Sequence, residues 1–355
     1  MKIEKLYPEV KDYLWGGKKL KEKYHKITDK EVCAESWELS FHKDGLTKLA
    51  DGRTLKDTAT EKDVGSNATG FEFFPLLVKL IDAQKNLSVQ VHPSDEYALK
   101  NEKSFGKTEV WYIVDADENA SIYLGFKRDV TEKELEKAIA DGTVTDLLNE
   151  YKVKKGECYF IPSGTMHGIN AGCVICEVQQ NSNLTYRVYD YNRVDKNGNK
   201  RELHVDKALK VTNLKKYAPV KTDGERLAIN KYFTLSRVRL NGENSVYADE
   251  KSFKCLTLVD GTCAVNGKEM LLGDSFFVPA GTGEVILKGN GDVLVSEVRK
   301  YYLTTQEKKG NITVTLVDDN GETIEEKNAP ATEKTAEELR DEILKERRMT
   351  ESDLS

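Results

Sequence analysis

Short apolar runs separated by glycine, asparagine and aspartate dominate the hydrophobic pattern between residues 70 and 190. The runs are FPLLVKLIDA, LSVQVH, EVWYIVDA, SIYLGF, GECYFIP, GCVICEVQQ and TYRVYDY. Many short strands with turn residues between them are typical of a β-barrel or β-sandwich. The pattern therefore predicts an all-β fold.

Residues 127–151 break this strand pattern. Thr131 and Glu134 have the spacing of a capping box, and Gly142 stands where a helix would stop. Between them, apolar residues recur at helical spacing at Leu135, Ala138 and Ile139. We therefore expect a short helical insert between strands.

A weak internal repeat predicts two related barrels. GECYFIPSGTMH, which starts at Gly156, returns as GDSFFVPAGTGE from Gly273, an offset of 117 residues. EVWYIVD at 109–115 matches KCLTLVD at 254–260, an offset of 145. The offsets differ by 28 residues, close to the length of the insert. We therefore expect a first barrel over 1–205, which carries the insert, and a second over 206–302.

Ligand-type side chains are kept only in the first copy. Glu109 is replaced by Lys254 in the second copy, and His167 is replaced by Glu284. If the copies superpose, Lys254 and Glu284 converge as an ion pair where the first copy could hold a metal. The alternative is that one or both of these side chains reach solvent.

After about residue 303 the composition shifts to charged residues, so we expect residues 303–355 to be a charged C-terminal extension. The sequence predicts a hairpin, a linker and a charged helix with a capping box at Thr335 and Glu338. The helix has only a thin apolar stripe, so a solvated appendage is favoured over a partner-binding helix.

Overall composition excludes several classes of function. The chain has 355 residues, with 54 basic and 60 acidic residues mixed along it, which argues against nucleic-acid binding. We find no leader-like apolar segment and no run of about 18 apolar residues, so we expect a cytoplasmic protein without a membrane partner.

The six cysteines are too scattered for a disulfide framework, and we expect reduced thiols. Cys173 and Cys176 form a CxxC, but on a strand they point to opposite faces, which favours core cysteines over a redox or zinc pair.

The segment SVQVHP at 88–93 places three polar side chains on one face of a strand. Alone, this face could simply be exposed to solvent. His92, Glu109 and His167 lie on three predicted strands, and Gln90 shares the face of His92. Two imidazoles, a carboxylate and an amide oxygen suit a divalent catalytic metal such as Zn²⁺. On residue types alone, a hydrogen-bonded core role for His167 remains an alternative.

Six motifs resemble the type I mannose-6-phosphate isomerases, in particular their short bacterial form. They are DYLWGG, AESWELS, SVQVHP, GKTEVWYI, IPSGTMHGI and QNSNLTYRVYDYNR, and the match spans roughly residues 5–300. The resemblance implies two cupin-like (jelly-roll) barrels and an aldose–ketose isomerase acting on a sugar phosphate, D-mannose 6-phosphate or D-fructose 6-phosphate. It also implies one zinc per chain, bound by Gln90, His92, Glu109 and His167.

The resemblance further places five residues in or near the pocket. Lys107 and Arg187 are the expected catalytic residues. The resemblance does not assign the proton transfer, which we expect Lys107 to carry because it sits beside the metal site, with Arg187 stabilising the enediolate. The expected substrate-binding residues are Ser88, Trp15 on the pocket wall and Arg193 near the phosphate. Neither the oligomeric state nor the role of the extension follows from the sequence.

Two other functions fit part of this pattern. Cupin dioxygenases bind Fe(II) through two histidines and a carboxylate, but they usually have H-x-H with a nearby glutamate, whereas Gln90 stands first here and Glu109 comes 17 residues after His92. A sugar-phosphate-binding protein without activity would tolerate loss of Lys107 or Arg187, and both are present.

Overall fold

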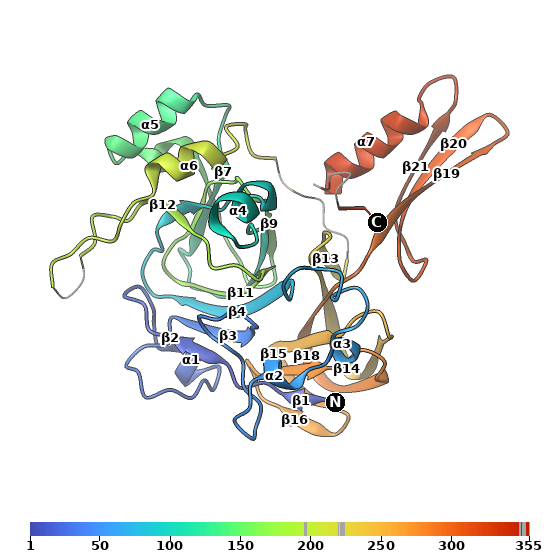
Figure 1. Ribbon diagram of the computed structural model, residues 1–355, viewed down its shortest axis with the longest axis horizontal. Coiled ribbons are helices and arrows are strands. Elements are labelled where there is room, and N and C mark those ends of the chain that lie inside the picture. Colours follow the sequence, from blue (N-terminus) through green and yellow to red (C-terminus); the bar gives the residue numbers. More distant parts are fainter. Residues whose placement is uncertain (195–196, 219, 221–223, 348, 350–352, 355) are drawn as a thin grey trace.

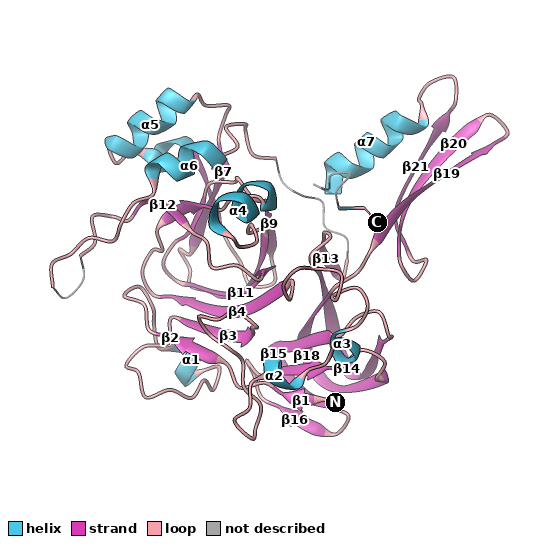
Figure 2. Cartoon of the chain, viewed as in Figure 1, coloured by secondary structure: helices cyan, strands magenta, loops and turns pink. Residues whose placement is uncertain are grey.

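The computed structural model describes residues 1–194, 197–218, 220, 224–347, 349 and 353–354. Strands dominate these residues, and they form four antiparallel sheets (Figures 1 and 2). The mostly β prediction is therefore confirmed.

Two sheets pack face to face around the predicted metal ligands. The central sheet has the order β2-β3-β4-β11-β6-β9, with strands Glu9–Lys11, Glu35–Leu39, Leu76–Ala83, Cys173–Gln180, Glu109–Ala116 and Cys158–Ile161. The pocket sheet has the order β12-β5-β10-β7-β8, with strands Tyr186–Tyr189, Val89–Val91, His167–Ile169, Ser121–Phe126 and Leu148–Lys152. Trp111 and Ile113 of the central sheet pack with Ile122 and Leu124 of the pocket sheet in one buried core.

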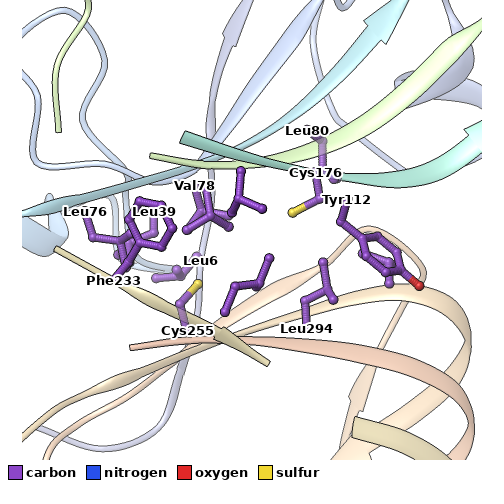
Figure 3. Packing of buried hydrophobic residues seen from close by; sticks show 14 of the residues in the cluster. Leu6, Leu39, Leu76, Val78, Leu80, Tyr112, Cys176, Phe233, Cys255 and Leu294 are labelled. Atoms are coloured by element: carbon purple, nitrogen blue, oxygen red, sulfur yellow. The ribbon is translucent and has the colours of Figure 1, made fainter. Parts of the chain in front are cut away.

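The central sheet is buried on both faces. In β11, Cys173 and Ile175 face the pocket sheet, whereas Val174 and Cys176 face the opposite way, in a second core (Figure 3). Alternation along the strand thus separates the two cysteines of the CxxC, as predicted. All six cysteines are free thiols.

A third sheet, the distal sheet, packs on the other face of the central sheet. Its order is β1-β17-β15-β18-β14-β13, with strands Glu4–Lys5, Ser275–Val278, Lys254–Val265, Gly283–Glu297, Thr234–Ala248 and Arg226–Ile229, and β16 (Lys268–Met270) pairs with β15. Leu6, Cys255 and Leu294 meet Leu80 and Cys176 across this interface (Figure 3). The N-terminal strand β1 therefore belongs to the distal sheet, beside residues of the predicted second barrel.

Short helices cover the edges and outer faces. They are α1 (Lys19–Glu22), α2 (Leu55–Thr58), α3 (Glu61–Val64), α4 (Asp95–Glu102), α5 (Glu132–Ala140), the 3₁₀ turn Val144–Leu147, α6 (Val205–Val211) and α7 (Ala336–Arg347). Helices α5 and α6 pack on the outer face of the pocket sheet (Figure 1).

Helix α5 confirms the predicted helical insert. Thr131 caps it by accepting from the Glu134 backbone, and Gly142 follows it with a positive φ of 72°. The end of the 127–151 segment differs from the prediction, because Leu148–Lys152 is strand β8 and completes the pocket sheet.

The strand registers match the internal repeat. Glu109 pairs with Ile161 between β6 and β9, and Lys254 pairs with Val278 between β15 and β17, which reproduces both sequence offsets. The predicted partner of Lys254 was wrong. Glu284 is exposed near the start of β18, and the buried Lys254 pairs instead with Glu297 at the end of that strand.

The C-terminal extension is a small folded unit rather than a hairpin, a linker and a solvated helix. Strands β19 (Tyr301–Lys308), β20 (Asn311–Asp318) and β21 (Thr323–Pro330) form the extension sheet, beside which α7 lies to one side of the main body (Figure 1). Leu339 and Ile343 of α7 pack on Val314 and Leu316. The predicted capping box is present, since Thr335 and Glu338 bond each other's backbone N–H. Among the described residues, no helix is long and apolar enough to cross a membrane.

Candidate active site

The four predicted metal ligands meet between the central and pocket sheets. Gln90 is the middle residue of β5 and His92 follows that strand, while His167 opens β10 directly opposite Gln90. Glu109 opens β6 on the facing sheet. The ligand atoms of His92, Glu109 and His167 lie within 4.8 Å of one another, and all three residues are buried. Val89 and Val91 point the other way, into the core under α5 and α6, so the polar face of SVQVHP is the inner face.

Backbone contacts orient both imidazoles toward Glu109. His92 Nδ1 lies 2.7 Å from the Leu184 carbonyl and His167 Nδ1 lies 2.8 Å from the Thr165 carbonyl, so each Nδ1 donates and each Nε2 keeps its lone pair. The two Nε2 atoms lie 3.7 Å and 3.3 Å from the Glu109 carboxylate. Glu109 Oε1 is buried without a hydrogen-bond partner among the described residues. These residues fit a divalent metal, which would satisfy that oxygen.

Burial sets the protonation of these groups. It lowers the pKa of His167 to about 4, and together with the nearby charge of Lys107 it holds the pKa of His92 well below its usual range. Both imidazoles are therefore neutral near pH 7, as metal ligands must be. Burial and repulsion from Glu177 raise the pKa of Glu109 to about 8, against the attraction of Lys107.

A cavity of about 860 Å³, counted to its open mouth, lies over this cluster. Its lining residues come from both sheets and from the N-terminal loop: Tyr13, Trp15, Glu35, Lys79, Ile81, Leu87, Ser88, Gln90, Lys107, Ile169, Glu177, Asn183, Thr185, Arg187 and Arg201. The lining is rich in charged and polar groups, as a small polar substrate requires.

Lys107 joins the metal ligands to a second buried carboxylate. Its ammonium donates to Glu109 and lies 3.2 Å from His92 Nε2 and 3.5 Å from Glu177. Glu177 also accepts from Trp111 Nε1 at 2.9 Å and pairs with Lys79 at 3.3 Å. Burial would raise the pKa of Glu177, but Lys107 and Lys79 lower it to about 2.

Three predicted pocket residues line the side of the cavity. Arg187 Nε donates to Ser88 Oγ at 3.2 Å, and its Nη1 donates to the Glu202 carbonyl at 3.0 Å. The buried Trp15 forms part of the wall, with its ring centroid 5.6 Å from that of Tyr13. Strand β12 pairs Arg187 with Gln90, which places the guanidinium beside the ligand cluster.

Comparison with known proteins places the chain in a family. Residues 3–120 match the phosphomannose isomerase type I catalytic domain, and residues 224–298 match the cupin domain of mannose-6-phosphate isomerase. The mannose-6-phosphate isomerase ManA of Bacillus subtilis is 34% identical over 310 residues, which cover 82% of this chain and 97% of ManA. The chain belongs to the type I mannose-6-phosphate isomerase family.

Solved structures of mannose-6-phosphate isomerases share the fold. A crystal structure of the Bacillus subtilis enzyme has a TM-score of 0.74 and 34% identity, and the match covers 83% of this chain and 99% of that one. A mannose 6-phosphate isomerase bound with zinc and yttrium is 19% identical with a TM-score of 0.68, over 84% of this chain and all of that one. The segments matched by the family models end at residue 298, before the extension.

Sequence reasoning missed several residues of this isomerase site. Lys79 and Glu177 are buried charges on β4 and β11, and each is flanked by apolar residues, in LLVKLI and VICEV. A charge between apolar neighbours in a strand buried on both faces is the signal that could have found them. Glu35 and Tyr13 were missed as well.

Arg193 and Arg201 lie differently with respect to the cavity. Arg193 is not among the described residues that line the cavity, since its guanidinium donates to the Asn86 carbonyl and lies 5.6 Å from the Tyr191 ring. Arg201, which carried no predicted role, does line the cavity.

Proposed function

We propose that this protein interconverts D-mannose 6-phosphate and D-fructose 6-phosphate, with one zinc ion per chain held by Gln90, His92, Glu109 and His167. The observation that carries the proposal is the buried cluster of His92, Glu109 and His167 under a cavity lined by lysine and arginine. Within the part of the chain that the structure describes, this is the only such group of potential metal ligands, which supports one ion per chain.

The isomerisation moves a proton from C2 to C1 of the open-chain sugar, while a second proton passes from O2 to O1. When bound, zinc supplies a Lewis acid that polarises the sugar oxygens. We assign the carbon proton transfer to Lys107 Nζ, which as the neutral amine takes the proton from C2 and as the ammonium returns it to C1. This nitrogen lies against Glu109 and His92 at the closed end of the cavity. Glu177 lies 3.5 Å from this nitrogen and is itself held by a hydrogen bond from Trp111 Nε1.

Arg187 supplies positive charge beside the reacting carbons. Its guanidinium donates to Ser88 and to the Glu202 carbonyl, so it is oriented before substrate arrives. A preoriented donor stabilises the developing enediolate without reorganisation during the reaction. Ser88 positions Arg187 and Gln90, and Trp15 excludes water from the wall side.

We further propose that the two halves are cupin-like barrels over 1–205 and 206–302, followed by the extension 303–355. The repeated registers at Glu109 and Lys254 and the cupin model at 224–298 support this division. The segment 127–151 is then an insert of the first barrel.

A coupled assay tests the proposed reaction. Purified protein is incubated with mannose 6-phosphate, fructose 6-phosphate is measured, and the metal content is determined by elemental analysis. We expect turnover, one zinc per chain, loss of turnover on treatment with a chelator, and its return with Zn²⁺. Full turnover by metal-free protein, or no turnover with zinc bound, would contradict the proposal.

A further inference from the structure

Arg201 brings a second guanidinium group to the cavity, together with that of Arg187. The Arg201 side chain is 30% exposed, whereas that of Lys107 is 4% exposed. Arg201 therefore lies toward the open mouth, while Lys107 and the metal ligands form the closed end.

Asp190 fixes the orientation of Arg201. Arg201 Nε donates to Asp190 Oδ2 at 2.7 Å, and its Nη2 donates to Oδ1. Such a two-point pair holds the planar guanidinium in one orientation. Within the described part of the chain, the third nitrogen, Nη1, has no hydrogen-bond partner, so it is available to a ligand in the cavity.

The charge around Asp190 is not balanced. This buried carboxylate also pairs with Arg193 at 3.6 Å, so one negative charge serves two guanidinium groups. Arg187 and Arg201 line the same cavity, and repulsion from Arg201 adds to burial in lowering the pKa of Arg187. An anion between them would relieve that repulsion.

We propose that Arg201, oriented by Asp190, recognises the phosphate group of the substrate, a dianionic phosphomonoester. This inference rests on the isomerase function proposed above. With C1 and C2 of the sugar at the metal ligands and Lys107, the phosphate on C6 points toward the mouth, where Arg201 lies. Arg193 lies outside the cavity lining, where one nitrogen donates to the Asn86 carbonyl and the other terminal nitrogen is buried away from solvent.

Kinetics of Arg201→Gln and Arg201→Lys test the assignment. We expect Arg201→Gln to raise KM for mannose 6-phosphate about 10- to 100-fold, the effect of losing a charge-assisted contact, with kcat within about threefold. Arg201→Lys keeps the charge but loses the planar set of guanidinium donors, so its KM should lie between those of the wild type and Arg201→Gln. Asp190→Asn should raise KM in the same direction, because Arg201 would lose its orientation.

Lys200→Gln is the matched control, because it makes the same change of charge at the exposed neighbouring residue. Calorimetric titration with inorganic phosphate gives a second readout that does not need turnover, and Arg201→Gln should weaken that binding while Lys200→Gln should not. A KM within twofold of wild type in Arg201→Gln, or an equal rise in Lys200→Gln, would overturn the assignment. If the wild type lacks isomerase activity, the proposed reaction fails, and the phosphate titration still decides the role of Arg201.

Discussion

Lys254 Nζ lies 2.7 Å from Glu297 Oε2 at the end of the distal sheet, where the repeat places the counterpart of Glu109. Arg299 Nε lies 2.8 Å from the same carboxylate oxygen, and Arg299 Nη1 lies 2.7 Å from Asp249. The second copy of the repeat thus gathers a network of buried charges where the first copy gathers metal ligands.

Lys254→Ala should lower the free energy of unfolding by about 2–3 kcal/mol, because a buried carboxylate loses one of its cations. Glu297 keeps Arg299, so the loss should stay below that of a carboxylate left without any partner. Urea unfolding monitored by circular dichroism measures the change. Lys288→Ala, an exposed lysine on β18, is the control and should change stability by less than about 0.5 kcal/mol.

His167→Ala should abolish both zinc binding and turnover. It removes one of the proposed ligands, and the remaining ligands cannot hold the ion in place. Elemental analysis and the coupled assay check this together. His25→Asn changes an exposed histidine and should leave zinc content and activity unchanged. A His167→Ala protein that retains one zinc per chain would show that the metal site is elsewhere.

Arg187→Ala should lower kcat by roughly two to three powers of ten, since it removes charge that stabilises the enediolate. Thermal unfolding should change little, because in the described structure the Arg187 side chain donates only to Ser88 and a backbone carbonyl, and its backbone bonds are kept in the variant. Arg128→Ala, at an exposed arginine paired with Glu134, serves as the control. An unchanged kcat with a raised KM would instead make Arg187 a phosphate contact.

Much of the fold followed from the sequence because period-two alternation and turn residues are local signals. The repeat offsets equated Glu109 with Lys254, and the registers of the two strands agree with that equivalence. Glu297 was not found as the partner of Lys254, because it lies outside the aligned motif and only the pairing of β15 with β18 brings it near. Strand β21 was missed because TIEEKNAP is polar, as an edge strand can be.

The site was predicted less completely than the fold. The four ligands carry recognisable side chains in recognisable motifs, and the structure gathers His92, Glu109 and His167. Lys79 and Glu177 instead depend on which strands are neighbours, since β4 and β11 pair Lys79 directly with Glu177. A sequence does not show that register before the sheet order is known.

Asp319 joins the extension to the main body. Replacing it tests how strongly the stability and activity of the main body depend on the extension. In the turn after β20, Asp319 Oδ2 accepts from Asn67 Nδ2 at 2.6 Å, and Oδ1 lies 3.4 Å from Arg299 Nη1. Asp319→Asn keeps the shape but removes the charge. We expect a loss of about 1–3 kcal/mol in the free energy of unfolding, because a buried charge-assisted contact is lost.

The same variant should keep kcat and KM for mannose 6-phosphate within about twofold, since the extension supplies no residue to the described cavity lining. Asp341→Asn, an exposed carboxylate on α7, is the control for the change in charge and should affect neither stability nor activity. If Asp319→Asn instead lowered kcat strongly while the protein stayed folded, the extension would be coupled to catalysis, and its contact through Arg299 to Glu297 would be the path to examine.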